Sequence, residues 1–142
     1  VTILLGDGRG AFNPAPGSPV RVGDAPTSIV ASDFTQDSVL DLATANADGT
    51  VTVLRGDGRG GFVPAPASPL RTASGATLVE SGDFDRDGRV DLVTVGFSGF
   101  QIHLGRGDGT FSSRDLQSAP FGFGSPGVFV TDFTRDGVPD LV

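Results

Sequence analysis

The chain has 142 residues, including 22 glycines and ten prolines, with a formal net charge of -7 and neither cysteine nor methionine. The negative charge argues against nucleic acid or an anionic membrane surface as a partner, and the lack of cysteine excludes disulfides, cysteine-ligated zinc and a thiol nucleophile. No apolar run is long enough for a membrane-spanning helix, and because Met is missing even at position 1 we expect the chain to be a piece of a longer protein.

Two motifs repeat along the chain with a period of about 50 residues. A glycine-rich turn ending in Phe occurs at Gly6 to Phe12, Gly56 to Phe62 and Gly105 to Phe111. An Asp-Phe pair followed by Asp-Leu begins at Asp33, Asp83 and Asp132, so the copies are 50 and then 49 residues apart. A fixed period of this length is typical of repeat architectures.

The apolar and β-branched residues alternate between turn residues, which predicts strands. In chain order the clearest are Val1 to Leu5, Thr50 to Arg55, Thr77 to Asp83, Val90 to Val95, Phe100 to Leu104 and Leu141 to Val142. We interpret each repeat as four strands. The first two flank the Asp-rich segment, the third precedes the glycine-rich turn and the fourth follows it.

The predicted fourth strand is rich in proline in the first two copies. Its prolines are Pro14, Pro16 and Pro19, then Pro64, Pro66 and Pro69, whereas Arg114 to Phe123 in the third copy lacks this pattern. Because proline cannot donate a backbone hydrogen bond, we expect this strand at an exposed sheet edge, where proline also blocks pairing with other chains.

Four antiparallel strands per unit of this length are typical of a β-propeller blade. We therefore predict an all-β chain of about three four-stranded blades that starts and ends in the middle of a blade. The single repeat region 1–142 then divides into a half-blade at 1–27, blades at 28–76 and 77–126, and a half-blade at 127–142. Because propellers close with roughly four to eight blades, we expect a longer repeat chain or a homo-oligomer.

The Asp-rich segments place oxygen-bearing side chains at positions 1, 3, 5 and 9. The predicted ligands of the middle copy are Asp83, Asp85, Asp87, Asp91 and the backbone carbonyl of Arg89. A hard cation such as Ca²⁺ takes six to eight oxygens, and Gly88 permits the tight turn that aims them inward. An EF-hand is excluded, because the flanking segments are predicted strands and position 12 is Thr94 rather than Glu.

The outer copies keep the pattern with fewer charges. Their predicted ligands are Asp33, Thr35, Asp37, Asp41 and the carbonyl of Val39, then Asp132, Thr134, Asp136, Asp140 and the carbonyl of Val138. We expect about one Ca²⁺ per segment, up to three, with weaker outer sites. The alternative is that Asp and Gly only form turns on a solvated rim, but three or four carboxylates within nine residues would then repel one another.

Three further features are candidate partner or catalytic sites. Arg106-Gly107-Asp108 matches a tripeptide that integrins bind, but we interpret it as an ordinary hairpin turn. We expect His103 to be packed and partly buried rather than a ligand or catalytic base, and Glu80 to be solvated or hydrogen-bonded rather than to line a ligand channel. No pairing of an acid with a base or nucleophile is apparent, so we name no catalytic or cofactor-binding residue and expect no enzyme.

The segments Asp83 to Leu92 and Gly105 to Phe111 resemble the FG-GAP or VCBS repeat, which the propellers of integrin α-subunits share. The resemblance covers nearly the whole chain in three registers. It implies that the Asp-rich segment joins the first two strands of a blade and binds calcium through Asp83, Asp85, Asp87 and Asp91. The family is mostly extracellular or on the cell surface, in adhesion, glycan-binding or accessory roles.

The main functional hypothesis is therefore a calcium-binding extracellular module that binds a protein or glycan, with a structural metal and neither nucleic acid binding nor membrane insertion. One alternative is a self-assembling subunit in which Val1 to Leu5 of one copy pairs with Leu141 to Val142 of another, giving a closed oligomer or a fibre. Another is a non-catalytic domain of a secreted carbohydrate-active enzyme. Arginine at every basic position favours a bacterial source.

Overall fold

The computed structural model describes residues 1–73, 75–114, 117 and 127–142. The described strands are β1 (Leu4–Gly6), β2 (Phe12–Pro14), β3 (Pro26–Ser32), β4 (Asp41–Asn46), β5 (Thr50–Gly56), β6 (Phe62–Pro64), β7 (Leu70–Arg71), β8 (Ala76–Gly82), β9 (Asp91–Gly96), β10 (Gly99–Gly105), β11 (Phe111–Ser113), β12 (Val130–Thr131) and β13 (Asp140–Leu141). Among these residues there is no helix that could cross a membrane, and the prediction of an all-β chain is confirmed.

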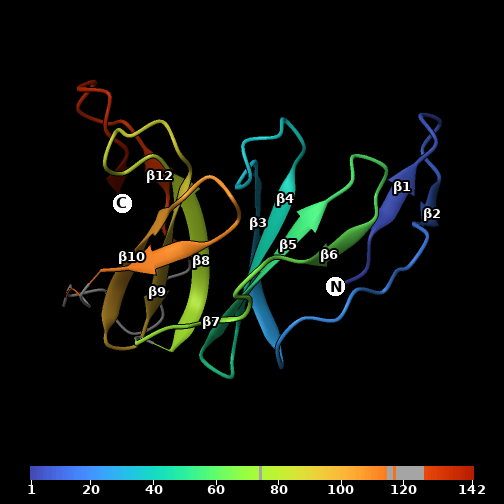
Figure 1. Cartoon of the computed structure of the whole chain (residues 1–142), viewed down its shortest axis with the longest axis horizontal. Coiled ribbons are helices and arrows are strands. Elements are labelled where there is room, and N and C mark those ends of the chain that lie inside the picture. The colour runs from blue at the N-terminus through green and yellow to red at the C-terminus, as the bar shows by residue number, and fades with distance from the viewer. Residues whose placement is uncertain (74, 115–116, 118–126) are drawn as a thin grey trace.

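The strands form four antiparallel sheets that follow one another along the chain (Figure 1). The first sheet comprises β1 and β2, and the last comprises β12 and β13. Between them lie the sheet β3-β4-β5-β6, with β7 also paired to β5, and the sheet β8-β9-β10-β11. In the described part of the chain these sheets do not close into a ring, and β1 and β13 lie at opposite ends of the series.

The proline-rich fourth strand lies at a sheet edge as predicted, but it is broken into two pieces. Both β6 and β7 pair with β5, and the Ser68 hydroxyl in the intervening turn accepts a hydrogen bond from Val53 N at 2.9 Å. The first copy repeats this arrangement, with the Ser18 hydroxyl accepting from Ile3 N at 2.9 Å. In the third copy, residues 115–116 and 118–123 lie outside the described residues.

The core lies between the faces of successive sheets. One buried cluster comprises Phe34, Ala43, Ala45, Val51, Val53, Ala65, Ala76, Val79 and Leu92, from the two central sheets and their loops. A second comprises Val93, Val95 and Val128, against which Val130 and Leu141 of the last sheet pack. Side chains alternate between the two faces of a strand, so a central sheet can bury apolar residues against both neighbours.

The three Asp-rich segments occupy equivalent places, linking β3 to β4, β8 to β9, and β12 to β13. Contacts between them show that successive segments are neighbours in space. Gln36 Nε2 donates to Gly88 O at 3.2 Å, and Arg86 Nη2 lies 3.3 Å from Asp136 Oδ1. The fold therefore gathers the predicted metal ligands at one end of the stacked sheets.

Candidate metal centre

Three nine-residue segments, 33–41, 83–91 and 132–140, are here called the first, second and third Asp loops. All three share one hydrogen-bond framework. In the second loop, Asp83 accepts from the backbone N–H of Asp87 at 3.1 Å and of Gly88 at 2.9 Å, and Asp87 Oδ1 accepts from Arg89 N at 2.8 Å. The equivalent bonds of the other loops measure 2.8 to 3.2 Å. Each loop is thus held in shape by hydrogen bonds from its own backbone N–H groups to its own Asp carboxylates.

The framework requires left-handed backbone at positions 4 and 6 of each loop. Position 6 has φ of 66° at Ser38, 80° at Gly88 and 85° at Gly137. Glycine adopts this conformation without the steric cost that a Cβ brings. The first loop therefore carries strain at Ser38 that the other two avoid, yet it keeps the same shape.

The Asp at position 9 connects its loop to the third strand of the sheet. Asp91 has no exposed surface, and its two oxygens accept from Phe84 N and Gly105 N, each at 2.8 Å. Asp41 does the same with Phe34 N at 2.9 Å and Gly56 N at 3.0 Å. The spacing of the Asp residues does not reveal this role, although the glycine that opens every glycine-rich turn is a signal for it.

The second loop brings together three of its four predicted carboxylates. Ligand oxygens of Asp83, Asp85 and Asp91 lie within 4.8 Å of one another, and no other group of three acidic or histidine side chains in the described residues is as close. Asp87 is not in this group, because its Oδ2 contacts the Arg89 guanidinium. The backbone carbonyl of Arg89 accepts no hydrogen bond from the described residues.

The electrostatics of the second loop favour an added positive charge. Burial raises the pKa of the Asp91 carboxyl above its ordinary value, and the charges of Asp85 and Asp87 raise it further, while two backbone N–H groups act in the opposite direction. Arg86 faces Asp136 and Arg89 faces Asp87. Neither guanidinium therefore neutralises the three gathered carboxylates. In the third loop, the Gly137 N–H holds the pKa of Asp132 below its usual range.

The first and third loops have Thr at position 3, and the structure groups fewer carboxylates there. Thr35 Oγ1 is a buried side-chain oxygen without a hydrogen-bond partner in the described residues. Asp33, Asp37 and Val39 keep the framework of the second loop around it, and in the third loop Asp132, Asp136 and Val138 do the same. Thr134 donates its backbone N–H to Asp140 Oδ2 at 3.1 Å.

The remaining candidates lie elsewhere. Arg106-Gly107-Asp108 forms the turn after β10, where Arg106 N donates to Thr110 O at 3.0 Å and Asp108 Oδ1 accepts from Thr110 N at 2.9 Å. Glu80 in β8 is half-buried, burial raises its pKa, and no described residue hydrogen-bonds to its carboxylate. Neither this tripeptide nor Glu80 belongs to the Asp loops.

His103 is packed, as predicted, and is more deeply buried than predicted. Its ring is fully buried in β10, with Nε2 3.0 Å from Thr94 Oγ1 and Nδ1 2.8 Å from Ser113 Oγ. Burial lowers the pKa of His103 from 6.5 to about 4. The imidazole is thus held neutral, which suits a structural hydrogen-bond bridge between β9 and β11 rather than an acid–base role at neutral pH.

Acidification from pH 7 to pH 4.5 is expected to lower the free energy of unfolding by about 2.5 kcal/mol through His103 alone. The unfolded imidazole takes up a proton near pH 6.5, while the folded one does so only near pH 4. Stability is therefore complete above pH 6.5 and falls as the pH drops toward 4. His103→Leu, which copies Leu54 at the equivalent position, should remove this slope in urea titrations. An unchanged slope in that variant would contradict the assignment.

A family model for the FG-GAP-like repeat matches the chain twice, at residues 33–94 and 83–142. Together the matches span 33–142, more than three quarters of the 142 residues. Each match begins at the first Asp of an Asp loop and includes the following one. A search of curated proteins gave no match.

Proposed function

The chain belongs to the FG-GAP-like repeat family, and from this membership and its Asp loops we propose that it is a calcium-binding, non-catalytic module of an extracellular β-propeller. The metal has a structural role, holding the loops at one end of the sheets. The partner is a protein or glycan bound by loops of the assembled module. The observation that carries the proposal is the group of Asp83, Asp85 and Asp91 within 4.8 Å.

Calcium fits this group because all the donors are hard oxygens. Carboxylates of Asp83, Asp85 and Asp91 supply three ligands, and the free backbone carbonyl of Arg89 supplies another. Among the described residues no hydrogen bond reaches the Asp85 carboxylate, so the loop framework does not need it. The Asp85 carboxylate makes no hydrogen bond that stabilises the loop, yet it lies beside two other carboxylates. A bound cation best explains this placement.

The outer loops are proposed as weaker sites of the same kind. The buried, unpartnered hydroxyl of Thr35 supports a site in the first loop, because an oxygen in that place loses its water without gaining a hydrogen bond. Each Thr in place of Asp removes one negative charge. At affinities of roughly 0.1 to 1 mM, about 2 mM calcium adds roughly 0.7 to 1.8 kcal/mol of stability for each site.

The sheets are proposed to be propeller blades. Each central sheet contains four strands in meander order, β3 to β6 and β8 to β11, and the first also has β7 beside β5. The pairs β1-β2 and β12-β13 supply the outer and inner pairs of further blades. On this proposal the blades are 28–76 and 77–126 and the half-blades are 1–27 and 127–142, although β3 begins at Pro26 and β8 at Ala76. The extracellular location is supported by the family, whose repeats are typical of extracellular proteins, and by the calcium available there.

Asp85→Ala is expected to abolish most of the calcium-dependent stability of the second loop while leaving the calcium-free protein as stable as before. The side chain is exposed, and its loss removes only repulsion when no metal is bound. Thermal melts in calcium, in magnesium and in excess chelator, with calorimetric calcium titration, measure both effects. Asp85→Thr should give the weaker binding that the outer loops have.

Asp24→Ala is the matched control. Asp24 is exposed and lies outside the Asp loops, so this variant should retain the full calcium response. If the unchanged chain melts at the same temperature in calcium and in chelator, the Asp loops are ordinary turns held by their own hydrogen bonds, and the metal proposal fails. A loss of response in Asp24→Ala as well would point to non-specific charge screening.

A further inference from the structure

Neighbouring Asp loops are linked by the side chain at position 4. In the first loop this residue is Gln36, whose Nε2 donates to Gly88 O of the second loop at 3.2 Å. In the second loop it is Arg86, whose Nη2 donates to Asp136 O of the third loop and lies 3.3 Å from Asp136 Oδ1. The two side chains therefore make the same kind of link, but only that of Arg86 brings a positive charge.

The backbone at position 4 has the same left-handed conformation in all three loops. Its φ is 56° at Gln36, 59° at Arg86 and 59° at Arg135. A non-glycine residue rarely adopts this conformation, because its Cβ then crowds the following carbonyl oxygen. The shared backbone gives Gln36 and Arg86 the same direction, so that both side chains reach the next loop along the chain.

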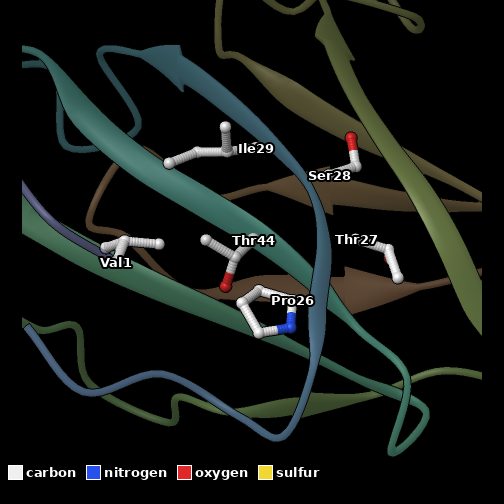
Figure 2. Close-up of a pocket in the computed structure, with 6 residues that line it drawn as sticks. All are labelled: Val1, Pro26, Thr27, Ser28, Ile29 and Thr44. Carbon is white, nitrogen blue, oxygen red and sulfur yellow. The ribbon is translucent and has the colours of Figure 1, made fainter.

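Charged contacts are concentrated at the Asp loops. The two ion pairs that the described residues form, Arg86 with Asp136 and Arg89 with Asp87, both belong to these loops. A cavity of about 190 Å³ lies beside β3 and is lined by Val1, Pro26, Thr27, Ser28, Ile29 and Thr44 (Figure 2). No charged side chain lines this cavity, so the charges that could influence a bound cation lie in the loops themselves.

Arg86 lies against a predicted ligand of the third loop. Asp136 is at position 5, and its Oδ1 also accepts from Val138 N at 2.8 Å. A Cβ at Gly137 would lie 3.6 Å from Arg86 Nη2, so the guanidinium lies close to position 6 as well. Because position 3 is Thr134, the third loop has carboxylates only at positions 1, 5 and 9. One of these already has a cationic partner.

We propose that Arg86 is a tethered cation that competes with Ca²⁺ for the third Asp loop and so lowers the calcium affinity of that loop. The physical cause is repulsion between the guanidinium and a divalent ion held by the same carboxylate. Gln36 makes the equivalent link to the second loop without a charge. This role of Arg86 rests on the proposed calcium sites, and it makes the second loop fill before the third.

The size of the effect follows from the exposure of the pair. The side chains of Arg86 and Asp136 are 51% and 60% exposed, so water and dissolved salt screen their interaction. Exposed ion pairs of this kind change an equilibrium constant by a few-fold rather than by orders of magnitude. We therefore expect a small change in affinity that depends strongly on ionic strength.

A calcium titration followed by amide NMR resolves the loops. The N–H groups of Gly88 and Gly137 report on the second and third loops, because each donates to the Asp at position 1 of its own loop. In Arg86→Gln, which copies Gln36, the half-saturating calcium concentration seen at Gly137 should fall about threefold at low salt. The difference should vanish at about 1 M salt, where the Debye length is about 3 Å.

Arg135→Gln is the matched control. Arg135 has position 4 of the third loop, is exposed and forms no ion pair with the described residues. This variant removes the same charge from the same region of the protein, so it should change the titration at Gly137 less than Arg86→Gln does. The reciprocal variant Gln36→Arg places a charge next to the second loop and should raise the half-saturating concentration at Gly88 about threefold.

Two different results would contradict the proposals in different ways. An unchanged titration at Gly137 in Arg86→Gln, or an equal change in Arg135→Gln, would overturn the role of Arg86 and leave the calcium sites intact. If calcium shifts the position-6 resonance of no loop in the unchanged chain, the proposed function itself is wrong, and the role of Arg86 falls with it.

Discussion

Gly105→Ala is expected to lower the free energy of unfolding by about 3 kcal/mol or more. The new Cβ would lie 2.1 Å from Val90 O and 3.0 Å from Val90 C, so two backbone segments would have to separate. Gly105 is buried, and the displacement would also strain the hydrogen bond from its N–H to Asp91. Urea denaturation, followed by circular dichroism and extrapolated to water, measures the change.

Gly6→Ala is the matched control for that experiment. The residue has the same place in its repeat, but its nearest neighbour is the Phe12 ring at 3.4 Å. This substitution should change the stability by less than about 0.5 kcal/mol. Equal losses in the two variants would mean that the glycines serve backbone flexibility rather than the close approach of a carbonyl.

The contrast shows which features of the fold are readable from sequence. The alternating residues of β5, β9 and β10 are local signals, and the strands they predict lie within a residue or two of the observed ones. At Gly105, in contrast, the constraint comes from a carbonyl 15 positions away in the chain. A single sequence does not distinguish a glycine that is needed for a turn from one that is needed for the close approach of a carbonyl.

The broken fourth strand was predictable from the sequence only in part. Pro64, Pro66 and Pro69 correctly indicated an exposed edge, because each removes a donor. The break between β6 and β7 depends also on the Ser68 hydroxyl, which takes the hydrogen bond from Val53 N that a continuous strand would take. A serine between prolines does not by itself predict this hydrogen bond, which depends on the position of the neighbouring strand.

The candidate site was predictable at the level of the loop but not of each side chain. Spacing placed Asp83, Asp85 and Asp91 in one nine-residue segment, and the structure gathers their oxygens. The spacing also predicted Asp87 as a ligand, yet its carboxylate faces Arg89, two positions further along the chain. Side-chain direction in an irregular loop depends on rotamers and on local charges, which a pattern of residue types does not specify.

Asp91→Ala is expected to lower the free energy of unfolding by about 3 to 5 kcal/mol, in chelator as well as in calcium. The substitution leaves the N–H groups of Phe84 and Gly105 without acceptors and opens a gap where the carboxylate is fully buried. This loss differs in kind from that of Asp85→Ala, which should appear only when calcium is present. Chemical denaturation in both conditions separates the two.

Asp140→Ala completes the comparison at position 9. Only one of its oxygens accepts hydrogen bonds from described residues, and the residue is partly exposed. Its loss should therefore lower the free energy of unfolding by less than about 1 kcal/mol. If Asp91→Ala were as mild as Asp140→Ala in chelator, the bridge between loop and third strand would be unimportant, and position 9 would act through the metal alone. The expected ordering instead makes Asp91 the anchor of the loop, because its carboxylate connects the backbone of Phe84 to Gly105 at the end of the third strand.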